Sequence, residues 1–387
     1  MHENSSKAYR VYTRREMLEL MARTGAGTAA ALIGLKALEF FMPSASAQDG
    51  GKAVRSRKAM YYTQLPGKRV KCLLCPRGVS LANGQSCYCR TRRNIDGNLY
   101  AIGYRKPCIV NFEPVERAPL YHFHPGTETM SLGAAGCNMT CLYCQNYELA
   151  QSSPENTRNL DVNEENALRK GPASSLTLTY TDAACQPEYL LYLSEIAEKL
   201  KFPLILCTGA YINSLPLQDI IPHTDAFAIT LKAATDEMYM KLTGVHLKPV
   251  LNSIKQVAGS GKWIEITTLI VPDYNDDAAG IQYIAKWIRD NAGENVPWHL
   301  SRFTPNYRLD KLPPTPRRTL EEAREIGLNA GLKYVYITNL APHDGNNTYC
   351  PSCHKKIIER LGFKTRKNYI ISGKCPFCRT VIPGKWT

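Results

Sequence analysis

Three closely spaced cysteines carry the most specific chemistry in this sequence. Cys137, Cys141 and Cys144 lie in GCNMTCLYCQN at C-x3-C-x2-C spacing. Three such thiolates can bind three irons of a four-iron, four-sulfur (4Fe-4S) cluster, whereas most clusters take four protein cysteines. The fourth iron then keeps an open position, as reactive metal sites do. The alternative is a zinc or disulfide cluster, but Cys141 and Cys144 form a single C-x2-C knuckle with no second knuckle nearby.

A second group of cysteines lies at the C-terminal end of the sequence and forms two C-x2-C knuckles. Its members are Cys350, Cys353, Cys375 and Cys378. Paired knuckles of this kind are typical of a zinc ribbon, in which four thiolates hold a structural zinc ion. Such an ion would stabilise a tail too short to build its own core. An auxiliary iron–sulfur cluster and disulfides remain alternatives.

A third group precedes the triplet and has C-x2-C-x11-C-x-C spacing. Its members are Cys72, Cys75, Cys87 and Cys89. The closing C-x-C is less typical of zinc, so this group is only a possible second metal site. The remaining cysteines are single: Cys108, Cys185 and Cys207. We expect these three to be small buried hydrophobic residues.

Short β-rich segments alternate with amphipathic helical segments after the N-terminal third of the chain. The predicted strands cover residues 129–134, 174–180, 203–208, 225–231, 263–271, 296–301 and 333–338. Helices are predicted at residues 188–201 and 318–331. This alternation favours a parallel sheet with right-handed crossovers. In parallel sheets the chemistry gathers at the carboxyl ends of the strands, and the cysteine triplet follows the first predicted strand directly.

The composition indicates one large globular domain with small additions. The chain has 387 residues, of which 44% are hydrophobic and 21% charged, which is enough for a large core. The formal net charge of +14 would attract anionic partners. No RNA-binding signature with interleaved aromatic residues accompanies this charge, so we do not expect nucleic acid as the partner.

The N-terminal segment has the pattern of an export signal. Arg14 and Arg15 precede an apolar stretch from Gly25 to Leu35, and residues 45–47 (Ala-Ser-Ala) form a small-residue cleavage site. The pattern predicts a twin-arginine signal over residues 1–47 and a periplasmic location. The alternatives are an amphipathic helix with an accidental arginine pair and a cytoplasmic protein.

The ordered motifs resemble the radical S-adenosylmethionine (SAM) component of the AmmeMemoRadiSam system, a family related to pyruvate-formate-lyase activating enzymes. The motifs run from about Lys71 to Trp386 and include CLLCPR, YHFHPG, GCNMTCLYCQN, VPWHLSRFTPNY and GKCPFCRTVIPG. The resemblance implies an α/β fold with a partial (β/α)6 barrel of the TIM type, in which the open iron of the cluster binds the amino and carboxylate groups of SAM. An electron from the cluster then cleaves SAM to a 5′-deoxyadenosyl radical, so the cofactor carries the hard chemistry.

The resemblance implies roles for individual residues as well. Tyr143 should lie beside the adenine of SAM, and the segment with Thr181 and Asp182 should meet its amino group. Lys232 should point to a carboxylate or phosphate. The other expected cofactor contacts are Asn146 and Thr208.

One further acidic residue is predicted inside the barrel. Glu265 should face the interior of the predicted fifth strand, where an unpaired carboxylate is costly. It contacts SAM or Lys232 as a catalytic residue, or it forms half of a structural ion pair. The lone histidines His246, His299 and His343 are expected to be structural, and Asn306 and Tyr307 to line the pocket.

The sequence departs from the family pattern at several of these positions. Asp182 replaces a family glutamate, Thr230 replaces an aspartate before Lys232, and Thr304 replaces a histidine. In the N-terminal cysteine group, Val79 replaces a family cysteine. These changes indicate an altered substrate, weakened SAM chemistry or neutral drift.

The sequence thus predicts four segments and one preferred function. The segments are the signal at 1–47, an N-terminal cysteine-rich module at 48–124, the radical SAM partial barrel at 125–341 and a zinc-ribbon-like module at 342–387. The preferred function is hydrogen abstraction from a protein, peptide or small-molecule substrate, with a ferredoxin or flavodoxin as electron donor and a Memo-like and an AMMECR-domain protein as implied partners. The alternatives are an exported, degenerate iron–sulfur protein for electron transfer or sensing, and a zinc-ribbon module that binds nucleic acid.

Overall fold

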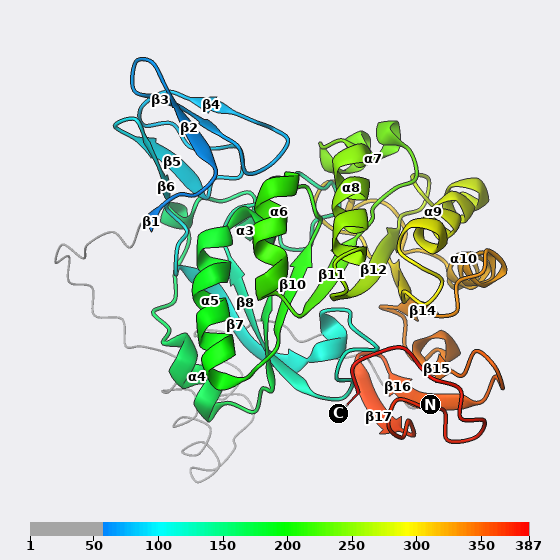
Figure 1. Cartoon of the computed structure of the whole chain (residues 1–387). Helices are drawn as coiled ribbons and strands as arrows, with labels where there is room; N and C mark the ends of the chain where they lie inside the picture. The colour runs from blue at the N-terminus through cyan, green and yellow to red at the C-terminus, as the bar shows by residue number, and fades with distance from the viewer. Residues whose placement is uncertain (1–56, 387) are drawn as a thin grey trace, which may run out of the picture. The chain divides into compact units, whose positions relative to one another are not determined.

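A single eight-stranded sheet forms the centre of the computed structural model, which describes residues 57–386 (Figure 1). The strands follow one another across the sheet in chain order, from β7 to β14, and β8 to β14 are all parallel. The strands are β7 (Pro107–Pro114), β8 (Glu128–Ala134), β9 (Ser175–Leu178), β10 (Leu204–Thr208), β11 (Ala226–Thr230), β12 (Trp263–Ile270), β13 (Trp298–Arg302) and β14 (Val335–Thr338).

Helices connect the parallel strands, and α5, α6 and α8 lie along one face of the sheet (Figure 1). The helices are α3 (Tyr147–Ala150), α4 (Glu164–Lys170), α5 (Pro187–Leu200), α6 (Ser214–Ile220), α7 (Asp236–Thr243), α8 (Leu247–Ala258), α9 (Ala278–Asn291) and α10 (Arg317–Asn329). Helix α5 shows why they form: Pro187 opens its first turn, Leu190 and Leu193 lie on its buried face, and Lys201 ends it in the left-handed conformation.

The predicted α/β fold with a parallel sheet is confirmed. Each of the seven predicted strands corresponds to one observed parallel strand, and both predicted helices are present as α5 and α10. The sheet has two separate edges, β7 and β14, as an open, partial barrel does. The prediction missed β7, an antiparallel edge strand whose Pro107, Asn111 and Pro114 are not typical of a strand.

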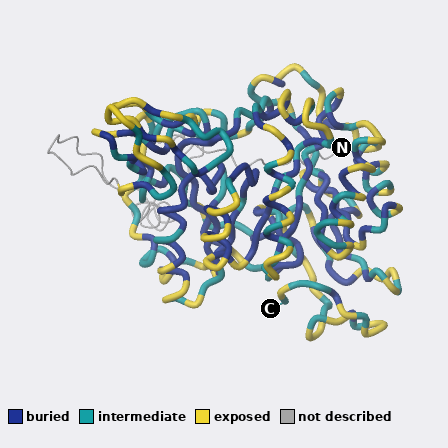
Figure 2. The backbone as a smooth tube through the Cα atoms, turned by 45° about the horizontal axis from the view of Figure 1, so that its top comes forward, coloured by how far each residue is buried: buried dark blue, intermediate teal, exposed yellow. Residues whose placement is uncertain are grey.

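Buried residues concentrate in the strands and on the inner faces of the helices (Figure 2). Strand β9 is buried at all four positions, and β8 is buried at every position after Glu128. This continuous burial is typical of parallel strands with both faces covered. The core therefore holds the carboxyl ends of β8 to β11 in fixed positions, where the cysteine triplet and its neighbours emerge.

Two small modules accompany the sheet. The N-terminal module consists of β1 (Arg57–Lys58), β2 (Tyr62–Leu65), β3 (Arg69–Cys72), β4 (Ser80–Leu81), β5 (Arg92–Ile95) and β6 (Asn98–Ala101). The C-terminal module consists of β15 (Thr348–Tyr349), β16 (Lys356–Leu361) and β17 (Lys364–Asn368). No helix in the range 57–386 has both the length and the apolar character needed to cross a membrane. The predicted signal at residues 1–47 lies outside the described residues.

Candidate iron–sulfur and SAM site

The loop that carries the cysteine triplet begins directly after β8 and is held by backbone hydrogen bonds. The Thr140 and Leu142 amides each donate to a carbonyl at the end of α7, over 2.9 Å. The Gly136 amide donates to the Leu149 carbonyl in α3 over 3.0 Å. The short loop is thus fixed on both sides, and its thiols face the same end of the sheet. This is where chemistry gathers in parallel α/β proteins.

Asp182 follows β9 and brings a buried carboxylate to this end of the sheet. Its side chain is only 4% exposed. It accepts hydrogen bonds from the Thr208 hydroxyl over 2.6 Å and from the backbone amides of Ala184 and Gly209, each over 3.1 Å. Burial nevertheless raises the pKa of Asp182. Burial also raises the pKa of the Cys137 thiol well above its usual range, and the negative charge of Asp182 adds to that rise.

Lys232 follows β11 and brings a positive charge to the same region. Its ammonium lies 5.7 Å from the centre of the Tyr143 ring, a cation–π distance. Within residues 57–386 this ammonium has no hydrogen bond and no ion pair. Burial opposes its charge, but nearby groups, the Cys141 thiol foremost, outweigh that effect and raise the pKa of Lys232.

Two other predicted cofactor residues tie the ends of β8 and β9 together. The Asn146 side-chain amide donates to the Tyr180 carbonyl over 2.8 Å, and the Thr181 hydroxyl donates to the Ala134 carbonyl over 2.7 Å. Tyr180 itself has a positive φ of 67°, in the left-handed region. Both side chains therefore position the backbone beside the thiols.

Residues after β13 also reach the triplet loop. The Tyr307 ring stacks on the Tyr147 ring with 4.4 Å between centroids, and the Arg308 amide donates to the Leu142 carbonyl over 3.0 Å. Tyr307 was expected to line the pocket. The observed stacking places it against the helix that follows the third cysteine.

Sequence reasoning missed two asparagines that shape the site. The Asn275 side chain donates to the carbonyls of Lys232 and Leu269, over 2.8 Å each, and so fixes the backbone of Lys232 to the end of β12. Asn138, next to Cys137, donates to the Tyr211 carbonyl over 2.7 Å. An asparagine in a loop is a weak signal by itself, because the same residue type occurs in ordinary turns.

The prediction that Glu265 is catalytic is corrected by the structure. Glu265 is in the first half of β12 and pairs in register with Ala228, four residues before Lys232. Its carboxylate is completely buried and accepts four hydrogen bonds, from the Tyr121 and His122 amides, the Trp263 indole and the His299 ring. The second alternative, a structural role, is the one observed: the His299 ring lies 2.7 Å from this carboxylate, and the two form an ion pair when the ring is protonated.

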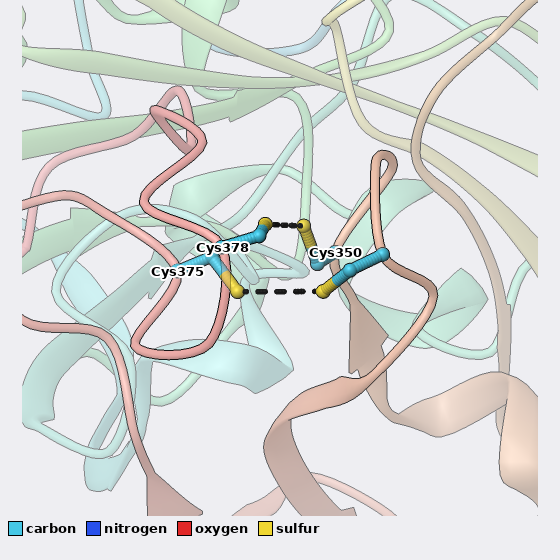
Figure 3. A group of neighbouring side chains, drawn as sticks. Cys350, Cys375 and Cys378 are labelled. Carbon is cyan, nitrogen blue, oxygen red and sulfur yellow. Dashed lines mark hydrogen bonds between the residues drawn. The ribbon is translucent and has the colours of Figure 1, made fainter.

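The four C-terminal cysteines converge closely, as Figure 3 shows for the labelled residues. All four sulfurs, with Cys353 as the fourth, lie within 4.8 Å of one another. The Cys350 and Cys378 sulfurs are 3.5 Å apart, and those of Cys353 and Cys375 are 3.7 Å apart. A zinc ion with Zn–S bonds of about 2.3 Å would place tetrahedral sulfurs about 3.8 Å apart. The group therefore has the geometry of a single-ion site.

The four N-terminal cysteines also share one location. Cys72, Cys75, Cys87 and Cys89 line a single small cavity, which Cys185 from the loop after β9 lines too. Cys185 is fully buried, as expected. The sequence had placed it outside every metal group, and the structure brings it beside one.

The residues at the carboxyl end of the parallel sheet fit a 4Fe-4S cluster with one open iron. They also fit a ligand that carries both a positive and a negative charge. The structure supplies three thiols, one buried carboxylate and one ammonium. Among the described residues, this ammonium has no partner, and two buried hydroxyls there, those of Tyr143 and Thr267, have no hydrogen bond. Buried polar groups normally have partners. The orphaned groups are thus consistent with a polar ligand that completes the site.

Comparison with known proteins assigns the chain to a superfamily. The Radical SAM superfamily profile matches residues 133–281. An uncharacterized protein of Methanocaldococcus jannaschii is 38% identical over 313 residues, which cover 80% of this chain and 93% of that protein. The pyruvate formate-lyase-activating enzyme of Clostridium pasteurianum is 23% identical over 45% of this chain and 76% of its own length. The (2S)-3-sulfopropanediol dehydratase activating enzyme of Klebsiella oxytoca is 18% identical over 35% of this chain and 43% of its own length. The chain therefore belongs to the radical SAM superfamily, which implies a 4Fe-4S cluster and SAM as its cofactors, and it is similar to activating enzymes.

Proposed function

We propose that this enzyme holds the amino-acid end of SAM between Asp182 and Lys232, beside the cluster loop, and abstracts hydrogen from a protein or peptide. The proposal rests on one observation: these two opposite charges follow the carboxyl ends of β9 and β11, on either side of β10, at the same end of the sheet as the three thiols. When bound, the reduced cluster and SAM supply the 5′-deoxyadenosyl radical. Thr208, Ala184 and Gly209 orient the Asp182 carboxylate toward a cation such as the SAM ammonium.

Lys232 is the matching group for the SAM carboxylate. Its side chain has the positive charge and the free donors that a carboxylate needs, and Asn275 fixes the backbone from which it extends. Tyr143 packs near the same ammonium, so an adenine ring beside Tyr143 would lie next to a cation.

Variants of these two residues test the SAM site. Asp182→Asn and Lys232→Met should each weaken the SAM-induced change in the EPR spectrum of the reduced cluster, while leaving the iron content unchanged. Asp236→Asn, on an exposed carboxylate of α7, is the matched control and should bind SAM normally. Unchanged SAM binding in both site variants would remove them from the proposed site.

The preference for a protein or peptide substrate rests on the relatives. Two of them are activating enzymes, and their names identify another enzyme as the target. The test uses an extract of cells that lack this protein, divided into a macromolecular and a small-molecule fraction. The macromolecular fraction should raise the yield of 5′-deoxyadenosine, and protease treatment should abolish the rise. A protease-resistant rise from the small-molecule fraction would contradict this preference.

The ordered sequence motifs support further partners of the AmmeMemoRadiSam type, namely a Memo-like protein and an AMMECR-domain protein. We propose these together with a ferredoxin or flavodoxin as the source of electrons. Reduction of the cluster by flavodoxin, followed by EPR, tests the electron donor. Co-purification of tagged partners expressed with this chain tests the other two.

The N-terminal segment supports export through the twin-arginine route. Cell fractionation of the wild type and of the Arg14→Lys/Arg15→Lys variant tests this. Periplasmic protein in the wild type and its loss in the variant are expected. An unchanged distribution would contradict the proposal.

A further inference from the structure

Five thiols from two parts of the chain line one small cavity. Four come from the N-terminal module, and the fifth, Cys185, comes from the loop after β9. The cavity holds a volume of only about 10 Å³. In a small module such convergence of thiols, four of them buried, indicates metal ligation more than packing.

The spacing of these thiols differs from that of the C-terminal group. In the described part of the chain, the C-terminal cysteines form the one set of four sulfurs that all lie within 4.8 Å of one another. The N-terminal thiols are more widely spread, as are the three thiols of the triplet. A single tetrahedral ion needs sulfurs about 3.8 Å apart. A wider set suits a cluster of several metal ions, in which each thiolate binds a different iron.

Two buried polar side chains, one lining the cavity and one next to Cys87, each keep one atom without a hydrogen bond among the described residues. Asn138 lines it, and its side-chain oxygen has no hydrogen-bond partner. Arg92 is completely buried and pairs with Glu188 over 2.5 Å, but its Nε has no partner. The Arg92 carbonyl accepts a hydrogen bond of 2.8 Å from the Cys87 amide, so Arg92 lies next to this cysteine. Glu188 already balances much of the positive charge of Arg92, so Arg92 would offset the negative charge of the thiolates only in part, and hydrogen bonds to sulfur tune iron–sulfur clusters.

The cavity shares a wall with the triplet loop. Gly136, directly before Cys137, packs so closely on the module that an added Cβ would lie 2.4 Å from the Cys89 carbonyl oxygen. Asn138, directly after Cys137, lines the cavity itself. Thr91 links the N-terminal module to the loop after β9. Its hydroxyl lies 3.1 Å from the Cys89 sulfur and 3.1 Å from the Cys185 carbonyl oxygen.

We propose that Cys72, Cys75, Cys87 and Cys89 bind a second iron–sulfur cluster, with Cys185 as the fifth thiol at its barrel side. This cluster lies next to the SAM-binding cluster, separated by residues 136–138. Cys185 lines the same cavity and so connects the second cluster to the loop that carries Asp182. The proposal does not depend on SAM cleavage, because it concerns iron content and the magnetic interaction between two clusters.

The test starts from a full-length variant that lacks the first cluster, Cys137→Ala/Cys141→Ala/Cys144→Ala. After anaerobic reconstitution with iron and sulfide, it should retain about four irons and four sulfides per chain. Addition of Cys72→Ala/Cys75→Ala should remove nearly all of that iron. Addition of Cys108→Ala, a thiol outside the cavity, is the matched control and should leave it bound. Iron that persists after Cys72→Ala/Cys75→Ala, or zinc in place of iron at this site, would overturn the proposal.

A second measurement uses the wild-type protein and does not depend on the folding of any variant. Reduced with dithionite, it should give about two spins per chain, with lines split or broadened by the interaction between the clusters. Cys185→Ala should retain the iron but shift the g-values of the second cluster. A single uncoupled spin in fully reconstituted wild type would contradict the proposal. Loss of SAM cleavage alone would bear on the proposed function and leave these results unchanged.

Discussion

Thr208 donates a hydrogen bond of 2.6 Å from its hydroxyl to the Oδ1 atom of Asp182. The same hydroxyl accepts a hydrogen bond of 2.9 Å from the Ala210 amide. The amide fixes the direction of the hydroxyl, so its proton points to the carboxylate. The end of β10 therefore orients and stabilises a buried negative charge at the end of β9, beside the cluster loop.

Thr208→Val should weaken SAM binding while leaving the cluster in place. The substitution keeps the shape of the side chain but removes a hydrogen bond to a charged group, which is worth about 1.5–3 kcal/mol. If Asp182 holds the SAM ammonium, the Kd for SAM should rise about tenfold to a hundredfold. EPR titration of the reduced cluster with SAM measures this. Thr208→Ser keeps the hydroxyl and should bind nearly as the wild type does, and equal affinity in all three proteins would exclude this role.

Gly136→Ala should destabilise the protein and impair assembly of the first cluster. Gly136 has φ of +98°, and an added Cβ would lie 2.4 Å from the Cys89 carbonyl oxygen and 2.5 Å from the Thr91 methyl group. Strain of this kind costs about 1–3 kcal/mol before any clash is counted. Urea unfolding and iron analysis measure the effect.

Gly293→Ala is the control for this substitution. Gly293 has φ of +111°, but no atom lies within 4 Å of the added Cβ. It therefore carries the backbone strain alone, and its loss of stability should be the smaller of the two. If the two variants lose the same stability, the close approach between the module and the triplet loop is not important.

The protein should lose stability as the pH falls from 6.5 to about 4, because His122 stays unprotonated in the folded protein over this range. His122 is buried, and burial lowers its pKa from 6.5 to about 4. Its Nε2 lies 2.5 Å from the Tyr336 hydroxyl and its Nδ1 2.7 Å from the Pro383 carbonyl oxygen. Below pH 6.5 the unfolded chain takes up a proton that the folded chain refuses. This shift should remove up to about 3 kcal/mol of stability between pH 6.5 and 4.

Urea unfolding over this pH range, compared between the wild type and His122→Gln, measures that contribution. The variant should be less stable at neutral pH, and its stability should depend less on pH than that of the wild type. His223→Gln changes an exposed histidine and should retain the wild-type slope. A His122→Gln slope equal to that of the wild type would contradict the expectation.

The C-terminal module should bind about one zinc ion per chain, because its four sulfurs have the spacing of a tetrahedral site. Cys353→Ala/Cys378→Ala should release this zinc and lower the unfolding temperature, with no loss of iron from the triplet. Cys207→Ala, a thiol on β10, is the matched control. Metal analysis by mass spectrometry would contradict the expectation if the zinc content of the double variant matched that of the wild type.

The sequence predicted the strands well because buried parallel strands are short apolar segments between clear helices. It predicted less about the ends of those strands. Alternation along β12 places Glu265 in the interior, but alternation gives the face of a strand and not the position along the barrel. The carboxylate thus lies with His299, away from Lys232. Cys185 was missed for another reason: metal motifs are recognised by local spacing, and Cys185 meets Cys89 only through the packing of the module on the barrel.

The most direct measurement of the central claim is the formation of 5′-deoxyadenosine from SAM. The anaerobically reconstituted protein, reduced with dithionite, should form 5′-deoxyadenosine and methionine. The Cys141→Ala variant, which lacks one cluster ligand, should form neither. A wild-type protein with an intact 4Fe-4S cluster that forms no more 5′-deoxyadenosine than Cys141→Ala would contradict the account.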